Sequence, residues 1–553
     1  MKTQILQPND DGINIAADIL KSGQVCAVPT ETVYGLAANA LDGAAVKRIF
    51  EAKGRPCDNP LIVHVSSVAE IAELVREIPH KAIKLFEKFA PGPLTIVLKK
   101  SAVVPFETSG GLDTVAVRIP KNETVRALIK ACDFPLAAPS ANKSGSPSPT
   151  TAEHVLCDLD GLIPAVIDGG ACEVGLESTV LSLANNTPRL LRPGAVTQQM
   201  IEEVIGPVDV DKSVTGESES ASAPGMKYKH YAPKTKLVLV EGTSKQFSEY
   251  VNKNKGEKTA VICFSEDETK GCERIVLGAE NDEESCGQAL FDALRKLDTL
   301  GCDIAFAHAP KKSGVGLAIY NRLLRAAAFE VVKFPFIVGV TGATGAGKTL
   351  LAKEFVRVGF AHLDADIIAR QTVQIGKPAL SALVKAFGED ILKADGSLNR
   401  AVLAKKAFAD KTSTKRLNDT IFPFYLKELE GELSQIKADF ILYDAPTLFE
   451  SSSDKYCDMT IGLLCDEKVR KRRILARDGI SEEMADLRIK AGKPDEFFEE
   501  NCDITMRSDM NADEFEKIAR HLAEEIKICH SEGEPRRISG KIEQQTSFCH
   551  CEE

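Results

Sequence analysis

The chain has 553 residues, of which 44% are hydrophobic and 27% charged, and its formal net charge is −11. This length suggests about three or four domains, and the acidic balance argues against a protein that coats nucleic acid through a basic surface. The 15 cysteines show no CxxC pair and no regular spacing, which indicates reduced thiols. The start lacks a signal peptide's apolar core, and no apolar run approaches the ~18 residues of a membrane span. We therefore expect a cytoplasmic protein with no membrane partner.

Residues 1–205 alternate short apolar runs with helix-like stretches, a pattern typical of an α/β sheet domain. We expect helices at 43–53 and 68–89. The expected strands are QVCAVPT, PLIVHV, LTIVLKK, TVAVRIP, PLAAPS, AVIDGG and STVLSL.

Polar residues of unusual kinds gather at the ends of these expected strands. They are Thr30, Thr32, Tyr34, Lys53, Arg55, Asn59, His64, Arg118, Ser178, Thr179 and Arg192, with the hydroxyl-rich loop PSANKSGSPSPT. An arginine at the end of an apolar strand is costly unless it meets an anion, so a phosphate-bearing ligand is expected. Singly, each signal has a plain alternative: His64 inside IVHV reads more readily as a core histidine, and the Ser/Pro loop as a linker.

A polar, Ser-rich stretch, DKSVTGESESASAP, follows at 211–224 and reads as a linker. We place an interdomain loop at 209–234 and a second, smaller α/β domain at 235–332. Its expected strands are KLVLVEG, TAVICFS and IAFAHAP, and its expected helices span 284–298 and 316–327.

Taken in order, these segments resemble the threonylcarbamoyl-AMP synthase family from about residue 10 to residue 330. APGMKYKHYAP (223–233) resembles the family's interdomain loop, and GVGLAIYNRLLRAA (314–327) the end of its long form. The resemblance implies a YrdC-like twisted-sheet domain over 1–208 and a small Rossmann-like domain after the loop. It also implies condensation of L-threonine, bicarbonate and ATP into threonylcarbamoyl-AMP, with release of pyrophosphate. The product would pass to the transferase machinery that modifies tRNA.

The resemblance also implies site residues. Around threonine it places Thr32, His64, Arg118, Ala138 and Ser178; around ATP it places Arg55, Asn59, Thr114, Ser140, Ser148, Arg192 and Tyr231. Lys53 and Arg55 would act in catalysis by offsetting repulsion among the anionic substrates. No residue stands out as a general base, so catalysis is expected to rest on positioning, with Mg²⁺ accompanying ATP.

An alternative for this half is an RNA-binding module of the same fold. Residues 1–205 contain 19 Lys and Arg against 23 Asp and Glu, so no basic excess is present to hold a phosphodiester chain. We expect no stable nucleic-acid binding.

The apolar run FPFIVGV at 334–340 begins a new domain, placed at 335–527, and leads into the strongest motif of the chain. Gly342, Gly345, Ala346, Gly347, Lys348 and Thr349 belong to a GxxxxGK[ST] sequence between a strand and a helix. Its backbone N–H groups would curl around phosphate oxygens, Lys348 would reach the β- and γ-phosphates, and the Thr349 hydroxyl would ligate Mg²⁺.

Carboxylates and arginines follow at places that suit such a loop. Asp364 and Asp366 end one short strand and Asp444 ends another, where a metal or an acceptor hydroxyl would sit; solvated loop aspartates are the plain alternative. Asp444 suits a contact to Mg²⁺ through water. The run VRKRRILARDG at 469–479 is either a solvated basic face or a lid over the transferring phosphoryl group.

The second half resembles the dephospho-CoA kinase family. The shared segments are VGVTGATGAGKT, LDADIIAR, FGEDIL, DGSLNRAVL, LNDTIFP, DAPTLFE and RRILARD. The resemblance implies a P-loop parallel-sheet fold with a lid, and phosphorylation of the ribose 3′-hydroxyl of dephospho-CoA by ATP. It makes Asp366 the general base, puts Arg370 and Arg400 on the acceptor side, and makes Arg473 and Arg477 lid arginines.

Departures from the family pattern concern the coenzyme A side. Phe422 precedes Pro423 where the family usually has histidine, PLLFE is PTLFE, and Gly492 stands in place of a glutamine. A kinase for another small molecule, or a domain that binds ATP without turnover, is the alternative. From 528 to 553 the chain is polar and aperiodic, and a disordered tail is expected.

Overall fold

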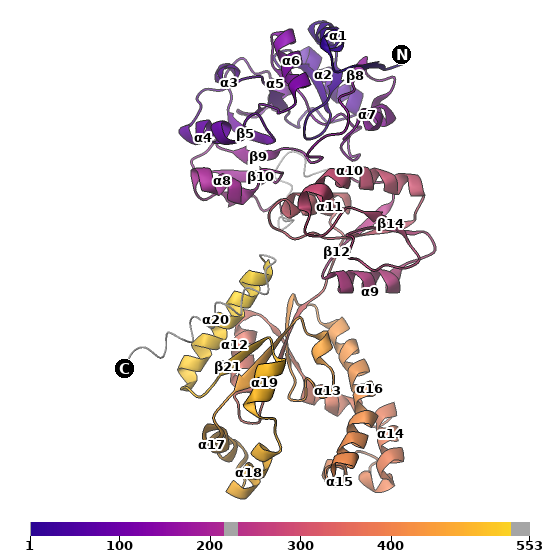
Figure 1. The fold of residues 1–553 in the computed structure, drawn as a ribbon, viewed down its shortest axis with the longest axis vertical. Coiled ribbons are helices and arrows are strands. Elements are labelled where there is room, and N and C mark those ends of the chain that lie inside the picture. Colours follow the sequence, from indigo (N-terminus) through magenta and orange to yellow (C-terminus); the bar gives the residue numbers. More distant parts are fainter. Residues whose placement is uncertain (1, 215–230, 532–553) are drawn as a thin grey trace. The chain divides into compact units, whose positions relative to one another are not determined.

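The computed structural model describes residues 2–214 and 231–531 (Figure 1). Residues 215–230 of the expected interdomain loop and residues 532–553 of the expected tail lie outside the described residues. The chain divides into two compact units, Met1–Lys333 and Phe334–Glu553. The predicted α/β fold class is confirmed in both.

The first domain of the first unit is built on one mixed sheet, in the order β1-β8-β2-β3-β7-β4-β6-β5-β9-β10-β11. Its strands are β1 (Gln4–Leu6), β2 (Cys26–Val28), β3 (Gly35–Asn39), β4 (Ile62–His64), β5 (Leu94–Lys99), β6 (Thr114–Arg118), β7 (Leu136–Ala137), β8 (Ala165–Ile167), β9 (Thr179–Ser182), β10 (Arg189–Arg192) and β11 (Asp209–Val210). Its helices are α1 (Asp10–Lys21), α2 (Gly43–Lys53), α3 (Val68–Leu74), α4 (His80–Phe89), α5 (Phe106–Ser109), α6 (Glu123–Cys132), α7 (Ala152–Leu159) and α8 (Gln198–Ile205).

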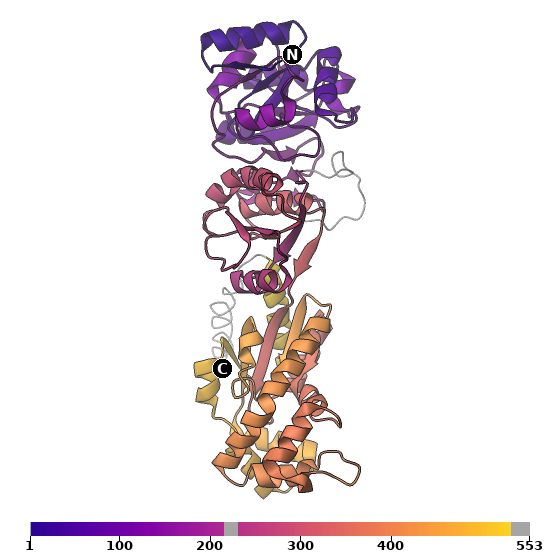
Figure 2. The same ribbon diagram turned by 90° about the vertical axis from the view of Figure 1, so that its right-hand side faces the viewer.

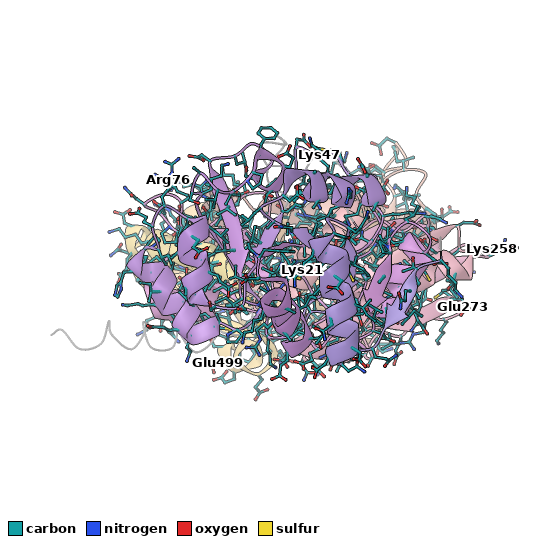
Figure 3. All side chains as sticks on the ribbon, turned by 90° about the horizontal axis from the view of Figure 1, so that it is seen from above. Lys21, Lys47, Arg76, Lys258, Glu273 and Glu499 are labelled. Carbon is teal, nitrogen blue, oxygen red and sulfur yellow. The ribbon has the colours of Figure 1, made fainter. Side chains whose placement is uncertain are left out.

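Apolar residues on both faces of this sheet explain why its central strands read as continuous apolar runs. Along β3, Leu36 and Ala38 belong to one core cluster and Ala37 to the other. Helices α1 and α6 lie side by side over the cluster that contains Ala37 (Figure 1). Charged side chains of both signs project outward from the unit, as Lys21, Arg76 and Glu273 do in Figure 3.

The second domain of the first unit is a smaller sheet whose strand pairs are all parallel, in the order β14-β13-β15-β12-β16. Its strands are β12 (Lys236–Glu241), β13 (Thr259–Cys263), β14 (Glu273–Val276), β15 (Ile304–His308) and β16 (Val331–Lys333), and its helices are α9 (Ser244–Asn254), α10 (Glu283–Leu300) and α11 (Gly316–Ala326).

Helices α10 and α11 cover the side of this sheet that faces the first domain (Figure 1). Val33 and Leu176 of the first domain share a core cluster with Leu290 of α10. The Arg295 Nη2 atom also lies 2.9 Å from the Asp158 carboxylate. The two domains of the first unit therefore pack through both apolar and ionic contacts.

The second unit is built on a parallel sheet in the order β18-β19-β17-β20-β21. Figure 2 shows helices of this unit lying over its strands. Its strands are β17 (Phe336–Gly342), β18 (Ala361–Asp364), β19 (Phe440–Asp444), β20 (Met459–Leu464) and β21 (Ile504–Arg507). Its helices are α12 (Lys348–Val358), α13 (Ala365–Thr372), α14 (Pro378–Phe387), α15 (Arg400–Ala407), α16 (Lys411–Gln435), α17 (Glu467–Asp478), α18 (Glu482–Lys490), α19 (Asp495–Asn501) and α20 (Ala512–Ser531), with short 3-10 helices at Glu389–Ile391 and Asp454–Tyr456.

Helices cover both faces of this sheet, as the alternation along β17 requires. Val338 packs in the same cluster as Phe355 of α12 and Phe515 of α20, whereas Ile337 packs with Ile368 of α13 and Leu429 of α16. Among the described residues, no helix is both long and apolar enough to cross a membrane.

Two expectations about helices differ from the structure. The helix expected at 68–89 is two helices, because Pro79 is extended (φ −61°, ψ 149°) and begins α4 anew. Helix α20 continues to Ser531, beyond the expected start of the tail at 528. Ile526 and Cys529 are buried against the sheet, and this apolar stripe holds the last turns in place.

Candidate active sites

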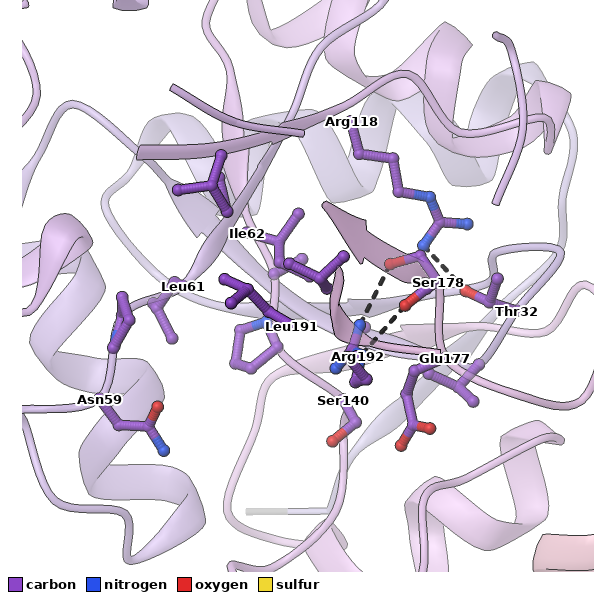
Figure 4. A pocket seen from close by; sticks show the side chains of 18 of the residues that line it. Thr32, Asn59, Leu61, Ile62, Arg118, Ser140, Glu177, Ser178, Leu191 and Arg192 are labelled. Atoms are coloured by element: carbon purple, nitrogen blue, oxygen red, sulfur yellow. Dashed lines mark hydrogen bonds between the residues drawn. The ribbon is translucent and has the colours of Figure 1, made fainter. Parts of the chain in front are cut away.

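A cavity of about 530 Å³ lies in the first unit. Residues of separate strands and loops of the first domain meet there, together with residues of α11. Of the residues predicted to bind or act on the substrates of this half, those in the cavity wall are Thr32, Lys53, Arg55, Asn59, His64, Thr114, Arg118, Ala138, Ser140, Ser178, Arg192 and Tyr231. Figure 4 shows Asn59 and Leu61 on one side of the cavity and Arg118 and Thr32 on the other.

Ser148 is the predicted ATP-binding residue that the structure does not bring to the cavity wall. Its side chain is fully buried, and its hydroxyl donates a hydrogen bond of 2.6 Å to the Glu177 Oε1 atom. Glu177 itself lines the cavity. Ser148 therefore contacts the site through Glu177, and a direct role in ATP binding stays a prediction.

Arg118 on the threonine side already has an anionic partner. Its Nη2 atom lies 2.7 Å from the Glu31 Oε1 atom, and its Nη1 atom donates to the Thr32 hydroxyl at 2.9 Å (Figure 4). Burial would raise the pKa of Glu31, but the charge of Arg118 and several hydrogen bonds hold it below its usual value. The anion that this strand-end arginine needs is therefore supplied within the protein by Glu31, which sequence reasoning missed, and the place of Arg118 beside threonine stays a prediction.

His64 ends β4 and lines the cavity while being 3% exposed. Its Nδ1 atom has no hydrogen-bond partner among residues 2–214 and 231–531. Burial, followed by the nearby charge of Arg118, lowers the pKa of His64 to about 3. The imidazole is therefore neutral at physiological pH, and its Nδ1 atom can form one hydrogen bond with a ligand.

We expect His64 to stay neutral from about pH 5 to pH 8. Because its pKa is lower in the folded chain than in the unfolded one, it contributes stability that is complete above the ordinary histidine pKa of 6.5 and declines as the pH falls toward 3. Histidine NMR titrations of the wild-type protein and of His64→Gln would test this. A signal that is absent from the variant and titrates near the ordinary value would contradict it.

Lys53 closes helix α2 just before Gly54, whose left-handed backbone (φ 62°) turns the chain toward Arg55. The Lys53 ammonium donates to the carbonyl oxygens of Ser140 and Asn142, at 2.6 Å for Asn142. Burial, with the charge of Arg55, lowers the pKa of Lys53 well below its usual value. Lys53 therefore holds the 140–142 loop in place, a positioning role that its sequence context did not show.

Arg55 and Arg192 give the cavity its positive charge. The Arg192 Nε atom donates to the Ser178 carbonyl at 3.0 Å and its Nη2 atom to the Ser178 hydroxyl at 3.1 Å (Figure 4). Burial lowers the pKa of Arg55 to about 10, and its Nε atom is buried with no partner in the described part of the chain. A guanidinium held in this way is suited to an anionic ligand.

Helix α11 supplies residues that sequence reasoning did not single out. Asn321 and Arg325 line the cavity. Arg322, which has no exposed surface, donates from Nε to the Glu177 Oε2 atom at 3.0 Å. The local signal was the set of polar residues Asn321, Arg322 and Arg325 within the mainly apolar segment GVGLAIYNRLLRA.

In the second unit, the predicted phosphate loop joins β17 to α12. Gly342, Gly345 and Gly347 adopt positive φ angles of 144°, 85° and 94°, which glycine tolerates best. The Lys348 ammonium donates to the Gly342 carbonyl at 2.7 Å. Ala346 is buried at the turn, and Thr349 is exposed at the start of α12.

Three carboxylates lie at the ends of the strands beside this loop. Burial and the neighbouring charges of Asp364 and Asp366 raise the pKa of Asp444, while Lys348 and His362 act against the rise. Burial lowers the pKa of Lys348, against the charges of Asp444 and Asp366. Asp364 caps α13 by accepting a hydrogen bond from the Asp366 N–H at 2.7 Å. The exposed Asp366 side chain remains available to the hydroxyl group of a substrate that accepts the phosphoryl group.

The predicted Mg²⁺ ligands fit a metal that is shared with phosphates. The Asp444 Oδ1 atom is buried and has no hydrogen-bond partner among the described residues, as expected for an oxygen that awaits a metal-bound water. No group of three or more His, Cys, Asp or Glu residues within 2–214 and 231–531 could hold a metal ion alone. Mg²⁺ usually keeps several waters and is held by one or two protein oxygens plus phosphates, and Thr349 and Asp444 would be those protein ligands.

The predicted lid arginines differ in their surroundings. Arg473 on α17 lies against the phosphate loop, because its Nη1 atom donates to the Gly345 carbonyl at 3.3 Å and its Nη2 atom to the Ser508 carbonyl at 2.6 Å. Arg477 instead pairs with Asp478, at 2.7 Å from Nε to Oδ1. Arg473 therefore bonds directly to the phosphate loop. Arg477 makes no hydrogen bond with the loop among the described residues, but its charge reaches Lys348 and contributes to the lowered pKa of that lysine.

The predicted acceptor-side residues are exposed. Arg370 lies one turn after Asp366 on α13, and Arg400 begins α15. Phe422 and Pro423 lie within α16, and Gly492 follows α18. No described contact joins these residues to the phosphate loop, so their roles stay predictions.

Comparisons with known proteins match both halves. Family models match residues 18–194 (Sua5, YciO and YrdC proteins, described as telomere recombination), residues 196–328 (threonylcarbamoyl-AMP synthase, C-terminal domain) and residues 336–514 (dephospho-CoA kinase). The threonylcarbamoyl-AMP synthase of Pyrococcus abyssi is 47% identical over 58% of this chain and 95% of its own length, and that of Bacillus subtilis is 45% identical over 60% and 97%.

The dephospho-CoA kinase of Enterococcus faecalis is 33% identical over 34% of this chain and 96% of its own length. Among solved structures, P. abyssi Sua5 complexed with L-threonine is 45% identical, with a TM-score of 0.57, over 60% of this chain and 99% of that one. Both predicted resemblances are confirmed, and the RNA-binding alternative is not favoured.

Proposed function

We propose that this chain catalyses two reactions, because it belongs to the threonylcarbamoyl-AMP synthase family through residues 18–328 and to the dephospho-CoA kinase family through residues 336–514. It forms threonylcarbamoyl-AMP from L-threonine, bicarbonate and ATP. It also transfers phosphate from ATP to the 3′-hydroxyl of dephospho-CoA.

The synthase reaction is supported most by the one cavity wall that gathers Thr32, His64, Arg118 and Ser178 with Arg55 and Arg192. Threonine's amine attacks bicarbonate to give a carbamate and water, and a carbamate oxygen then attacks the α-phosphorus of ATP, releasing pyrophosphate. All these reactants except the amine are anionic, so the cationic wall offsets their repulsion. Holding the reactants together supplies the remaining advantage.

The threonine subsite combines charge with shape. Arg118 bonds to the Thr32 hydroxyl and to the Glu31 carboxylate. The carboxylate balances the charge of the guanidinium, so this group of side chains is rigid and nearly neutral while it still presents N–H donors. The buried, neutral His64 lies in the same wall. We infer that Arg118 orients the threonine carboxylate and that Ala138 and Ser178 bound its side chain.

The kinase reaction is supported most by the phosphate loop with Lys348, Asp366 and Asp444 around it. Lys348 neutralises charge on the transferring phosphoryl group, and Asp366 accepts the proton of the 3′-hydroxyl. Thr349 and Asp444 would hold Mg²⁺, which would supply positive charge that offsets the charge of the phosphates. Arg473 stabilises the phosphate loop through the Gly345 carbonyl.

We propose further that threonylcarbamoyl-AMP passes to a transferase acting on tRNA, and that the protein works in the cytoplasm. The described cysteines are free thiols, as a reducing compartment favours.

Two omission assays on the intact protein test the proposal. With Mg-ATP, pyrophosphate release is expected only when both threonine and bicarbonate are present. ADP formation is expected only when dephospho-CoA is added. Pyrophosphate release at the same rate without threonine would refute the synthase assignment. ADP formation at the same rate without dephospho-CoA would refute the kinase assignment.

A further inference from the structure

Helix α11 belongs to the second domain of the first unit, yet it forms part of the wall of the synthase cavity. Asn321 and Arg325 stand one turn apart on α11 and both line the cavity. The Asn321 amide donates to the Val214 carbonyl at 2.8 Å, so one of its two N–H donors is used within the protein. Arg325 is the residue of the pair that carries charge toward a ligand.

The guanidinium of Arg325 has no hydrogen bond or ion pair with any described residue, although the side chain is half-buried. The other arginines of α10 and α11 at this domain contact differ. Arg322 bonds to Glu177 and to the Pro193 carbonyl, and Arg295 bonds to Asp158 and to the Pro147 carbonyl. A half-buried cation that lines a cavity without a protein partner calls for an anion there.

The surrounding charges point the same way. Burial lowers the pKa of Arg325, and the charge of Arg322 adds to this, while Tyr231 and Glu177 act against it. Arg55 and Arg192 line the same cavity. The Glu177 carboxylate does not balance Arg55, Arg192 and Arg325 as well, because its Oε2 atom already accepts from Arg322 and its Oε1 atom from Ser148. Three carboxylates (Asp113, Glu177 and Asp211) line the cavity against six cationic side chains (Lys53, Arg55, Lys99, Arg118, Arg192 and Arg325). The wall therefore carries a net positive charge to which both domains contribute.

We propose that Arg325 binds the polyphosphate of ATP in the synthase site, so that the second domain supplies part of this active site. The inference rests on the proposed synthase function. In the adenylyl transfer, a bond forms between the carbamate oxygen and the α-phosphorus, and the bond from that phosphorus to the bridging oxygen breaks. The electron pair leaves on pyrophosphate, and a guanidinium beside the polyphosphate stabilises that negative charge.

Arg322 acts as the positioning residue for this arrangement. Its guanidinium is buried and joins α11 to Glu177 and Pro193 of the first domain. Arg325 follows on the next turn of α11. The bonds of Arg322 to Glu177 and Pro193 therefore fix the position from which the Arg325 side chain enters the cavity. A charge on a rigid helix needs little reorganisation when the ligand binds.

The test compares Arg325→Ala, Arg325→Lys and Arg295→Ala in the intact protein. The readout is threonine-dependent pyrophosphate release without dephospho-CoA, so that the kinase site does not contribute. Loss of one charge-assisted contact should lower kcat/KM for ATP by about 10- to 100-fold in Arg325→Ala. KM for threonine should change less than about twofold, and lysine should restore much of the loss, because an ammonium also binds phosphate.

Arg295→Ala is the matched control, because it removes an interdomain ion pair whose members lie outside the cavity wall. It should keep kcat/KM for ATP near the wild-type value. An Arg325→Ala enzyme with wild-type kcat/KM for ATP would overturn the inference, as would an equal effect of Arg295→Ala, which would indicate domain docking alone. If the wild-type protein released no threonine-dependent pyrophosphate, the proposed function itself would fail.

Discussion

Replacing Lys348 by alanine should lower dephospho-CoA-dependent ADP formation by about 10²- to 10³-fold or more, the loss typical of removing one group that stabilises transition-state charge. The ammonium of Lys348 lies within the phosphate loop, where it bonds to the Gly342 carbonyl, and it feels the charges of Asp444 and Asp366. It is thus the cation of this loop that can follow the transferred phosphoryl group.

The same variant should release pyrophosphate from ATP, threonine and bicarbonate at the wild-type rate. Lys348 belongs to the second unit, and the cavity that we assign to the synthase is lined by the first unit alone. Lys353→Ala is the matched control, because this exposed lysine lies on the same helix without contacting the loop. It should keep both activities.

Coupled spectrophotometric assays for ADP and for pyrophosphate, run on the same preparations, would measure both rates. Unchanged ADP formation in Lys348→Ala would contradict the kinase assignment of the loop. Loss of both activities in a folded variant would contradict the independence of the two sites.

The parts of the fold that the sequence predicted well are those with local signals. The strand FIVGV, the glycines with positive φ and the helix after them are contiguous, so the phosphate loop was readable in one pass. Likewise α2 begins and ends where the pattern and Gly54 place it. The break at Pro79 also had a local signal, because proline cannot continue a helix whose N–H it lacks.

The parts that the sequence did not predict depend on contacts between distant residues. Glu31 meets Arg118 across 87 positions of the chain, and Glu177 meets Arg322 across 145. Each carboxylate sits in a segment whose hydroxyl residues drew attention instead, and nothing local marks it as buried. Sequence reasoning therefore assigned the excess charge at the strand ends to a ligand, whereas the protein neutralises part of it internally.

These internal ion pairs determine which side chains of the synthase cavity carry positive charge toward a ligand. Arg118 and Arg322 are neutralised by direct ion pairs with Glu31 and Glu177. Of the arginines that line the cavity, Arg55, Arg192 and Arg325 form no ion pair within 2–214 and 231–531, and Lys53 and Lys99 add to the positive charge of the wall. The subsite around Arg118 is thereby nearly neutral, which suits a zwitterionic amino acid. The remaining cationic wall suits a polyphosphate.

Replacing Arg322 by methionine should lower the free energy of unfolding of the first unit by about 3–5 kcal/mol, the usual cost of breaking a buried ion pair from one side. Arg322 has no exposed surface and bonds to the Glu177 carboxylate at 3.0 Å and to the Pro193 carbonyl at 2.5 Å. Without it, Glu177 stays buried with Ser148 as its remaining side-chain donor. The pKa of Glu177, now held low by Arg322 and Arg192 against the effect of burial, should rise.

The double variant Glu177→Leu with Arg322→Met should recover most of this loss, because well-packed apolar replacements of a buried pair are often neutral or stabilising. Lys121→Ala is the control, since its ion pair with Glu173 is on the surface and its loss should stay within about 0.5 kcal/mol. Urea unfolding followed by circular dichroism would give these differences. A single variant as stable as the wild type would mean that the two domains do not depend on this pair, and α11 would then lack the fixed position from which Arg325 reaches the cavity.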